Sequence, residues 1–249
     1  MAAHSLRMRG VRAGTALQPA AQLSVSRHGE AYAGMNAFTQ IVYVIGKLNP
    51  SGVEMLGTGF LIDQNGHIAT THHVVGSENS NLVVLAPHIR DINAYQDLST
   101  NTCQTIAVQI KEIDPIRDLA ILNSGLSFST ELPRIGGFDD DAVGDEVGIY
   151  GFPHCVEGRR TLTYQKAHLG AKVLLETNGI KSKHAVINTQ ARPGQSGSLV
   201  FSPKDQSISG MLVGAWVPGP GGISLGGINP RELHQTTQCV SAEYLKDML

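Results

Sequence analysis

Short apolar runs separated by turn residues make up most of the chain beyond residue 36. Residues 38–45 (FTQIVYVI) are rich in β-branched side chains and predict a strand, which the turn-forming segment 48–52 (LNPSG) ends. Residues 59–62 and 67–71 flank DQNG at 63–66. Because an Asn-Gly pair readily accepts positive φ, this stretch predicts a β-hairpin.

Further strands are expected at close spacing along the rest of the chain. They fall at residues 82–85, 104–113, 119–122, 146–150, 160–164, 185–190, 198–202 and 208–215. Many short strands without intervening helical periodicity are typical of a β-barrel or β-sandwich. One helix is predicted at the end of the chain, where Ser241 would cap it and Leu245, Met248 and Leu249 would line one face.

Composition narrows the functional classes. Of the 249 residues, 28 are glycine and only 16% are charged, against about 25% in an average soluble domain, which suits a compact, turn-rich fold. The formal net charge of −2 excludes a protein that binds nucleic acid or acidic membranes through bulk electrostatics. No membrane-spanning segment is expected, because the apolar runs are far shorter than the ~20 residues that cross a bilayer.

A turn-rich stretch at residues 123–143 divides the chain into two halves. It contains Asn-Ser-Gly at 123–125, Pro133 and three aspartates at 139–141. We therefore expect an N-terminal half at residues 34–128 and a C-terminal half at residues 129–249. The aspartate run lacks the oxygen-ligand spacing of an EF-hand, so it is interpreted as a solvated turn.

The first 33 residues differ from the rest. They carry arginines at positions 7, 9, 12 and 27, and their first acidic residue is Glu30. Because no continuous apolar segment follows, a secretory signal is not predicted. We expect a flexible tail without structure of its own, and the alternative is an organelle transit segment.

Cysteine usage bears on the compartment. The chain has three cysteines, Cys103, Cys155 and Cys239, which is an odd number with no CxxC pair. This pattern predicts separate reduced thiols and thus a reducing compartment, the cytoplasm. The histidines and cysteines lack metal-ligand spacing, so neither a metal nor another cofactor is expected.

Three short stretches carry candidate chemistry. The first joins GTGFLI at 57–62, through the hairpin, to TTHHV at 70–74. The second is DLAIL at 118–122, and the third is PGQSG at 193–197. Taken singly each occurs in many structural contexts, but their order along the chain gives histidine, aspartate and serine in turn.

Together these stretches resemble the trypsin-like serine peptidases, specifically their HtrA/Deg-like branch, over residues 38–249. The resemblance implies two six-stranded antiparallel β-barrels of the chymotrypsin-like type with a short C-terminal helix. It also implies a catalytic triad of His73, Asp118 and Ser196 and an oxyanion hole at Gly194, Gln195 and Ser196, with the N–H groups of Gly194 and Ser196 as donors. No PDZ module follows in this chain.

The chemistry itself requires these residue types. A serine hydroxyl is a poor nucleophile at neutral pH and needs a base within hydrogen-bond reach. Histidine suits that role because its pKa lies near working pH, and a buried carboxylate fixes the imidazole tautomer. The implied function is therefore peptide-bond hydrolysis through an acyl-enzyme.

Each triad position has a neighbour that competes for the role. His72 adjoins His73, and side chains of adjacent strand residues point to opposite faces, so only one of the two can face the substrate. Asp114 competes with Asp118, although it precedes a proline and resembles a turn residue. Ser198 competes with Ser196, but only Ser196 follows a Pro-Gly pair.

The substrate pocket is less well marked. In the chymotrypsin-like fold the residue six positions before the nucleophile lies at the base of the S1 pocket, and here it is Gln190, which cannot pair with lysine or arginine as a carboxylate would. The strand carrying Gly214, Ala215 and Trp216 should form one wall. Two departures from the family pattern are an insertion at 88–102 and Gly-Ser-Leu, in place of Gly-Gly-Pro, at 197–199.

Two other functions compete with endopeptidase activity. A catalytically silent module could grip extended peptides by β-strand addition, and an esterase could use the same triad. The expected partners are peptide or protein substrates, with a homo-oligomer left open.

Overall fold

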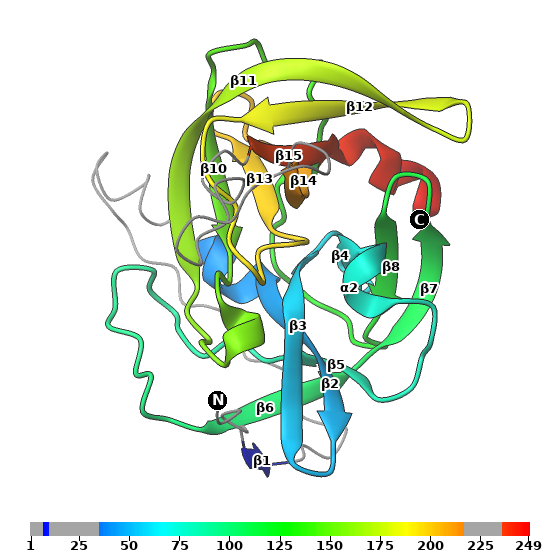
Figure 1. The fold of residues 1–249 in the computed structure, drawn as a ribbon. Coiled ribbons are helices and arrows are strands. Elements are labelled where there is room, and N and C mark those ends of the chain that lie inside the picture. The colour runs from blue at the N-terminus through cyan, green and yellow to red at the C-terminus, as the bar shows by residue number, and fades with distance from the viewer. Residues whose placement is uncertain (1–6, 10–34, 217–235) are drawn as a thin grey trace, which may run out of the picture.

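The computed structural model describes residues 7–9, 35–216 and 236–249, and strands dominate it (Figure 1). One sheet has the order β1-β6-β5-β2-β3-β4-β8-β7 and the other β13-β10-β11-β12-β15-β14-β9. The strands of the first are β1 (Arg7–Arg9), β2 (Val42–Asn49), β3 (Gly52–Leu61), β4 (His67–Thr71), β5 (Leu82–Leu85), β6 (Thr102–Ala107), β7 (Gln109–Asp114) and β8 (Leu119–Asn123). Those of the second are β9 (Arg134–Ile135), β10 (Glu146–Gly151), β11 (Thr163–Thr177), β12 (Ile180–Ile187), β13 (Leu199–Ser202), β14 (Ser207–Trp216) and β15 (Thr236–Ser241).

The second sheet closes on itself. Because β13 pairs with both β10 and β14, six strands form a closed barrel, to which β9 adds a short parallel pair. The first sheet curls into a half-barrel, and its end strands β1 and β7 do not pair with each other within the described residues. The predicted all-β double-barrel fold is thus confirmed, with the difference that ladder pairing closes only the second half.

The prediction of a strand beginning at residue 38 is wrong at its start. Residues 35–41 are helical, and β2 begins only at Val42. The helix buries Phe38 and Ile41, and the Phe38 ring stacks on Tyr150 of β10 with 4.0 Å between the ring centroids. Packing against the other half therefore overrides the β propensity of this stretch.

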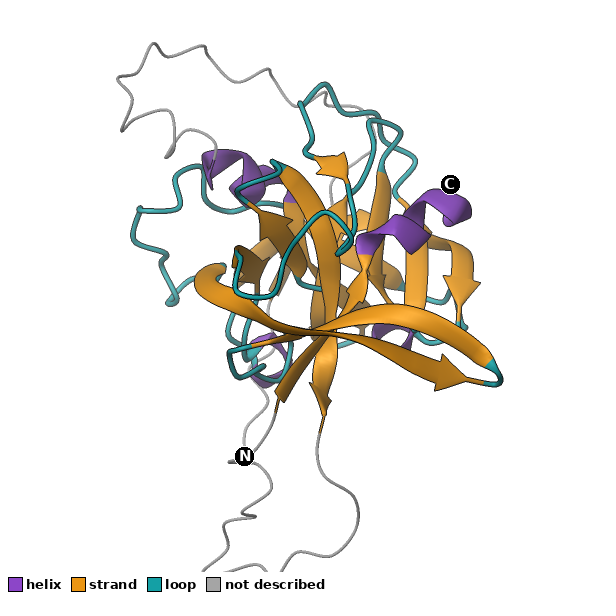
Figure 2. Cartoon of the chain, turned by 90° about the horizontal axis from the view of Figure 1, so that it is seen from above, coloured by secondary structure: helices purple, strands orange, loops and turns teal. Residues whose placement is uncertain are grey.

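Three other expectations need correction. The segment 104–113 is two strands, β6 and β7, separated at Val108. The C-terminal helix η3 (Ala242–Met248) is a 3₁₀ helix beside the strands (Figure 2), and Ser241 does not cap it, because its hydroxyl accepts the Phe138 N–H instead. Within the tail, Arg7–Arg9 forms β1 alongside β6, while residues 1–6 and 10–33 lie outside the described residues.

A buried hydrophobic cluster spans the two halves and fixes their relative position. Tyr150, Phe152 and Leu199 from the second half belong to the same buried cluster as the strands of the first half. The insertion at 88–102 adds polar ties, because the Gln96 amide both donates to and accepts from the backbone of Leu162. A site between the halves is therefore held by both.

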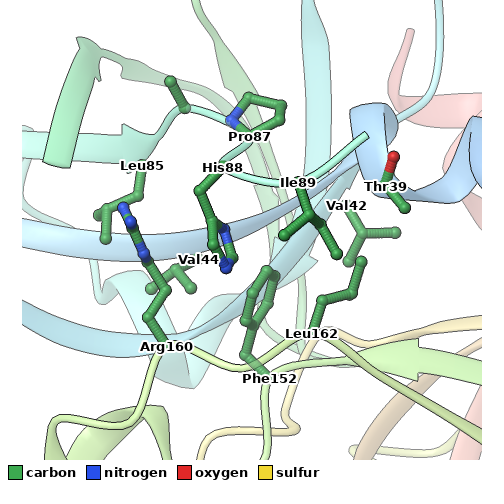
Figure 3. Close-up of a pocket in the computed structure, with 11 residues that line it drawn as sticks. Thr39, Val42, Val44, Leu85, Pro87, His88, Ile89, Phe152, Arg160 and Leu162 are labelled. Carbon is green, nitrogen blue, oxygen red and sulfur yellow. The ribbon is translucent and has the colours of Figure 1, made fainter. Parts of the chain in front are cut away.

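Figure 3 shows part of the contact between the two halves, where His88 from the insertion lies above Phe152 and near Arg160. His88 Nε2 is buried and has no hydrogen-bond partner among the described residues. Burial, and secondarily the Arg160 charge, lowers the pKa of His88 to about 4, so this histidine is neutral at physiological pH.

Two further findings concern cysteines and membranes. Cys103, Cys155 and Cys239 are all buried and free. Across the described ranges, no helix is both long and apolar enough to span a bilayer.

Candidate active site

Strand pairing brings the predicted histidine and aspartate together. β4 and β8 are antiparallel neighbours with Thr71 opposite Leu119. The residues that follow Thr71 therefore lie next to the residue that precedes Leu119. His73 Nδ1 lies 2.5 Å from Asp118 Oδ2, and the His73 backbone N–H donates to Asp118 Oδ1 at 2.8 Å.

This contact sets the roles of the two ring nitrogens. An ionised carboxylate only accepts hydrogen bonds, so Nδ1 carries the proton and Nε2 is left as the acceptor. The His73 side chain is 49% exposed and Asp118 is 26% exposed, so the histidine remains accessible to a substrate. Asp118 itself has φ of +59°, a left-handed conformation that aspartate tolerates better than most residues.

The competing histidine and aspartate have other partners. His72 Nε2 lies 3.2 Å from the Ser77 hydroxyl. Asp114 binds the Arg117 guanidinium at 2.6 Å and accepts two backbone N–H groups of its own turn. Both histidines lie in the single helical turn α2 (His72–Val75) and not on a strand, so strand alternation is not what separates them.

The serine lies on a sharp turn that only glycine allows. Gly194 and Gly197 on either side have φ of +89° and +87°. A Cβ on Gly197 would lie 1.9 Å from the Thr58 carbonyl oxygen, and one on Gly194 would lie 2.7 Å from Cys155 Sγ. Ser196 is partly exposed, whereas Ser198 is buried and its hydroxyl has no partner within the described part of the chain. Burial therefore leaves Ser196 as the reachable hydroxyl.

The turn that carries His73 (α2) and the turn that carries Ser196 (residues 194–197) approach each other at Gly57. A Cβ at Gly57 would lie 2.7 Å from Val74 Cγ2, next to His73 in α2, and 3.1 Å from the Ser196 carbonyl oxygen. Any larger side chain here would push the two segments apart. The first glycine of the GTGFLI stretch is thus required by the close approach of the two candidate catalytic elements.

Thr58, which sequence reasoning did not single out, anchors the serine turn. Its N–H donates to the Ser196 carbonyl at 2.9 Å, and its hydroxyl donates to the Gly194 carbonyl at 2.8 Å. The same hydroxyl accepts the Phe152 N–H at 3.1 Å. One buried threonine thereby ties the first half to two segments of the second, and its place between two glycines was the available signal.

The predicted oxyanion hole needs one correction. Gly194 and Ser196 have backbone N–H groups that donate to no acceptor among the described residues. Gln195 does not fit the role of a donor, because its N–H already donates to the Arg192 carbonyl at 3.0 Å and its side chain is fully buried. The N–H groups of Gly194 and Ser196 are therefore the two donors available to a developing oxyanion.

The predicted substrate pocket is described only in part. The exposed Gln190 accepts a hydrogen bond from Arg192 Nη1 at 2.8 Å, so a guanidinium lies at the expected pocket base. Gly214 lies on β14, with open space where a Cβ would be. The backbone of Ala215 and Trp216 continues this strand, but their side chains lie outside the described residues.

Comparisons with known proteins agree with this arrangement. A family model described as "Trypsin-like peptidase domain" matches residues 57–211, which include all three candidate catalytic residues. No curated protein matches the chain in sequence.

Solved structures share the fold at low sequence identity. The active form of the Rv3671c protease from M. tuberculosis is 20% identical, with a TM-score of 0.60 over 94% of this chain and 93% of that one. The MamO protease domain from Magnetospirillum magneticum is 15% identical, with a TM-score of 0.58 over 86% and 97% of the two chains. The HtrA-type protease AlgW with a decapeptide is 16% identical, with a TM-score of 0.57 over 88% of this chain and 66% of that one.

Proposed function

Because the chain belongs to the family of trypsin-like peptidase domains, we propose that it is a serine endopeptidase that cleaves peptide bonds through Ser196, His73 and Asp118. The observation that carries the proposal is the 2.5 Å contact between His73 Nδ1 and Asp118 Oδ2 in a turn that adjoins the serine loop. That contact leaves His73 Nε2 free to accept a proton. The free N–H groups of Gly194 and Ser196 support the same reaction class.

The reaction follows from these positions. Ser196 Oγ attacks the scissile carbonyl carbon while His73 Nε2 takes the hydroxyl proton, and Asp118 stabilises the imidazolium that forms. The N–H groups of Gly194 and Ser196 donate to the oxyanion of the tetrahedral intermediate. The C–N bond then breaks as His73 returns the proton to the leaving amine. Water repeats the sequence on the acyl-enzyme and releases the new carboxylate.

The direct test is cleavage of a peptide library by the purified chain, with products read by mass spectrometry. We expect new termini that are absent when Ser196→Ala is used at the same concentration. Binding of peptides without cleavage would favour the silent peptide-binding module instead. Hydrolysis of simple esters with no cleavage of any peptide would favour the esterase.

The same cleavage map tests substrate preference. We predict small or medium uncharged residues before the scissile bond, with kcat/KM lower by about tenfold or more for lysine or arginine there. The physical reason is that the neutral Gln190 cannot neutralise a cationic substrate side chain. Gln190 also binds the Arg192 guanidinium, whose positive charge would repel such a side chain. A map dominated by basic residues at that position would show that the pocket base is elsewhere.

A further prediction is that activity does not require proteolytic activation, in which a cut would release a new N-terminus. In trypsin-like zymogens a freed ammonium pairs with an aspartate just before the serine, but that position is Gln195, a neutral side chain already hydrogen-bonded to Arg192 N–H at 2.7 Å. A chain starting at Ala33 behind an uncleaved tag should keep kcat/KM within about threefold of the full chain.

The truncation removes β1, so the melting temperature of the truncated chain is measured separately from its activity. We expect a lower melting temperature, because β1 pairs with β6 over three residues. Activity that appears only after a specific cut near residues 30–40 would contradict the prediction.

A further inference from the structure

We propose that Gln165 on β11 is a positioning residue for the serine loop, residues 192–197. Through its hydrogen bond to Gln195 it holds the N–H groups of Gly194 and Ser196 toward the substrate. The proposal rests on the proposed peptidase function and adds the element that orders its oxyanion hole. The two glutamines lie 30 residues apart in the sequence and on different segments of the closed barrel.

Two hydrogen bonds, one at each polar atom, fix the orientation of the Gln195 side chain. Its Oε1 accepts the Arg192 N–H at 2.7 Å, and its Nε2 lies 2.6 Å from Gln165 Oε1. Because a backbone N–H can only donate, Oε1 must face Arg192 and Nε2 must face Gln165. Gln165 therefore supplies an acceptor, and an amide that donated at this place would not fit.

Strand geometry explains why Gln165 can reach the loop. Gln165 pairs with Ile149 across β10 and β11, and Ala167 and Leu169 on the same face of β11 line the barrel core. Gln165 continues this inward row as its polar member, where the barrel meets the serine loop. A polar residue on an otherwise apolar inward face needs a partner, and Gln195 is that partner.

The loop depends on this partner more than an exposed loop would. Gln195 is 0% exposed, so its amide cannot turn to water if Gln165 is lost. The backbone on either side of it carries the two free N–H donors of Gly194 and Ser196. Rotation of Gln195 to find another acceptor would turn these N–H groups away from the substrate. In this chain a neutral amide pair takes the place of the buried ion pair that orders the loop when a trypsin-like zymogen is activated.

Three variants at residue 165 distinguish a positioning role of Gln165 from a general effect on the stability of the fold. Gln165→Leu removes the acceptor, Gln165→Asn keeps an amide that is too short to reach, and Gln165→Glu keeps an acceptor at the same distance. Gln109→Leu is the matched control, because Gln109 is an exposed strand glutamine on β7. Each is compared with the wild type for kcat, KM, melting temperature and affinity for a substrate-derived peptide aldehyde, whose adduct places an oxyanion in the hole.

We expect Gln165→Leu and Gln165→Asn to lower kcat and aldehyde affinity by about 10- to 100-fold, with KM within about threefold. Gln165→Glu should recover both to within about threefold of the wild type, as should Gln109→Leu. Equal losses in the Glu and Leu variants, or wild-type kcat in the Leu variant, would overturn the proposal.

Hydrogen exchange gives a readout that does not require catalysis. The hydrogen-bonded amides of Arg192, Gln195 and Gly197 should exchange faster in Gln165→Leu than in the wild type, while those of β4 and β8 should be unchanged. Unchanged exchange in the loop would overturn the positioning role even in an active enzyme. A wild type that cleaves no peptide yet shows the expected exchange difference would instead refute the peptidase function alone.

Discussion

Ser196→Ala is expected to abolish peptide hydrolysis, with kcat falling on the order of 10⁴-fold or more while the fold stays intact. The substitution removes one partly exposed hydroxyl and leaves in place the hydrogen bond from the Thr58 N–H to the carbonyl of residue 196. The measurement is the rate of cleavage of a single library-derived peptide, alongside the melting temperature.

Ser198→Ala is the matched control, because its hydroxyl is buried two residues away and has no described partner. It should retain kcat within about threefold. Comparable activity in wild type and Ser196→Ala would remove Ser196 as the nucleophile, and a large loss in Ser198→Ala alone would move the role to that residue.

His73→Ala is expected to be similarly severe, with kcat falling on the order of 10⁴-fold, because the serine proton then has no acceptor. His72→Ala removes a neighbouring imidazole whose contact is with the Ser77 hydroxyl, and it should change kcat by less than about threefold. Both variants remove the same chemical group from the same helical turn, so their difference isolates the role of the imidazole that contacts Asp118. Equal rates in the two variants would contradict the assignment.

The resemblance of the sequence motifs to trypsin-like peptidases predicted that His73 and Asp118 would meet, and the strand pairing seen in the structure explains why they do. Asp118 directly precedes the buried strand β8, and His73 follows β4, so pairing of these two strands brings them together. The glycines at 194 and 197 likewise signal a turn with positive φ.

Features that depend on contacts between distant segments could not be predicted in this way. Thr58 bonds to Gly194 across 136 residues, and its place between two glycines does not indicate which distant segment it would bind. Gln165 lies just beyond the strand expected at residues 160–164, and its partner is defined only once the barrel closes. The helix at 35–41 forms for a related reason, because Phe38 packs on Tyr150 of the other half.

The most direct test of the central claim is covalent labelling of the folded protein with a fluorophosphonate, followed by peptide mapping. Such reagents phosphonylate a serine only when a base activates it. We predict a single adduct on Ser196 in the wild type, and none in Ser196→Ala or His73→Ala at the same reagent concentration and time. An absence of labelling in the folded wild type, or an adduct on a different serine, would contradict the account.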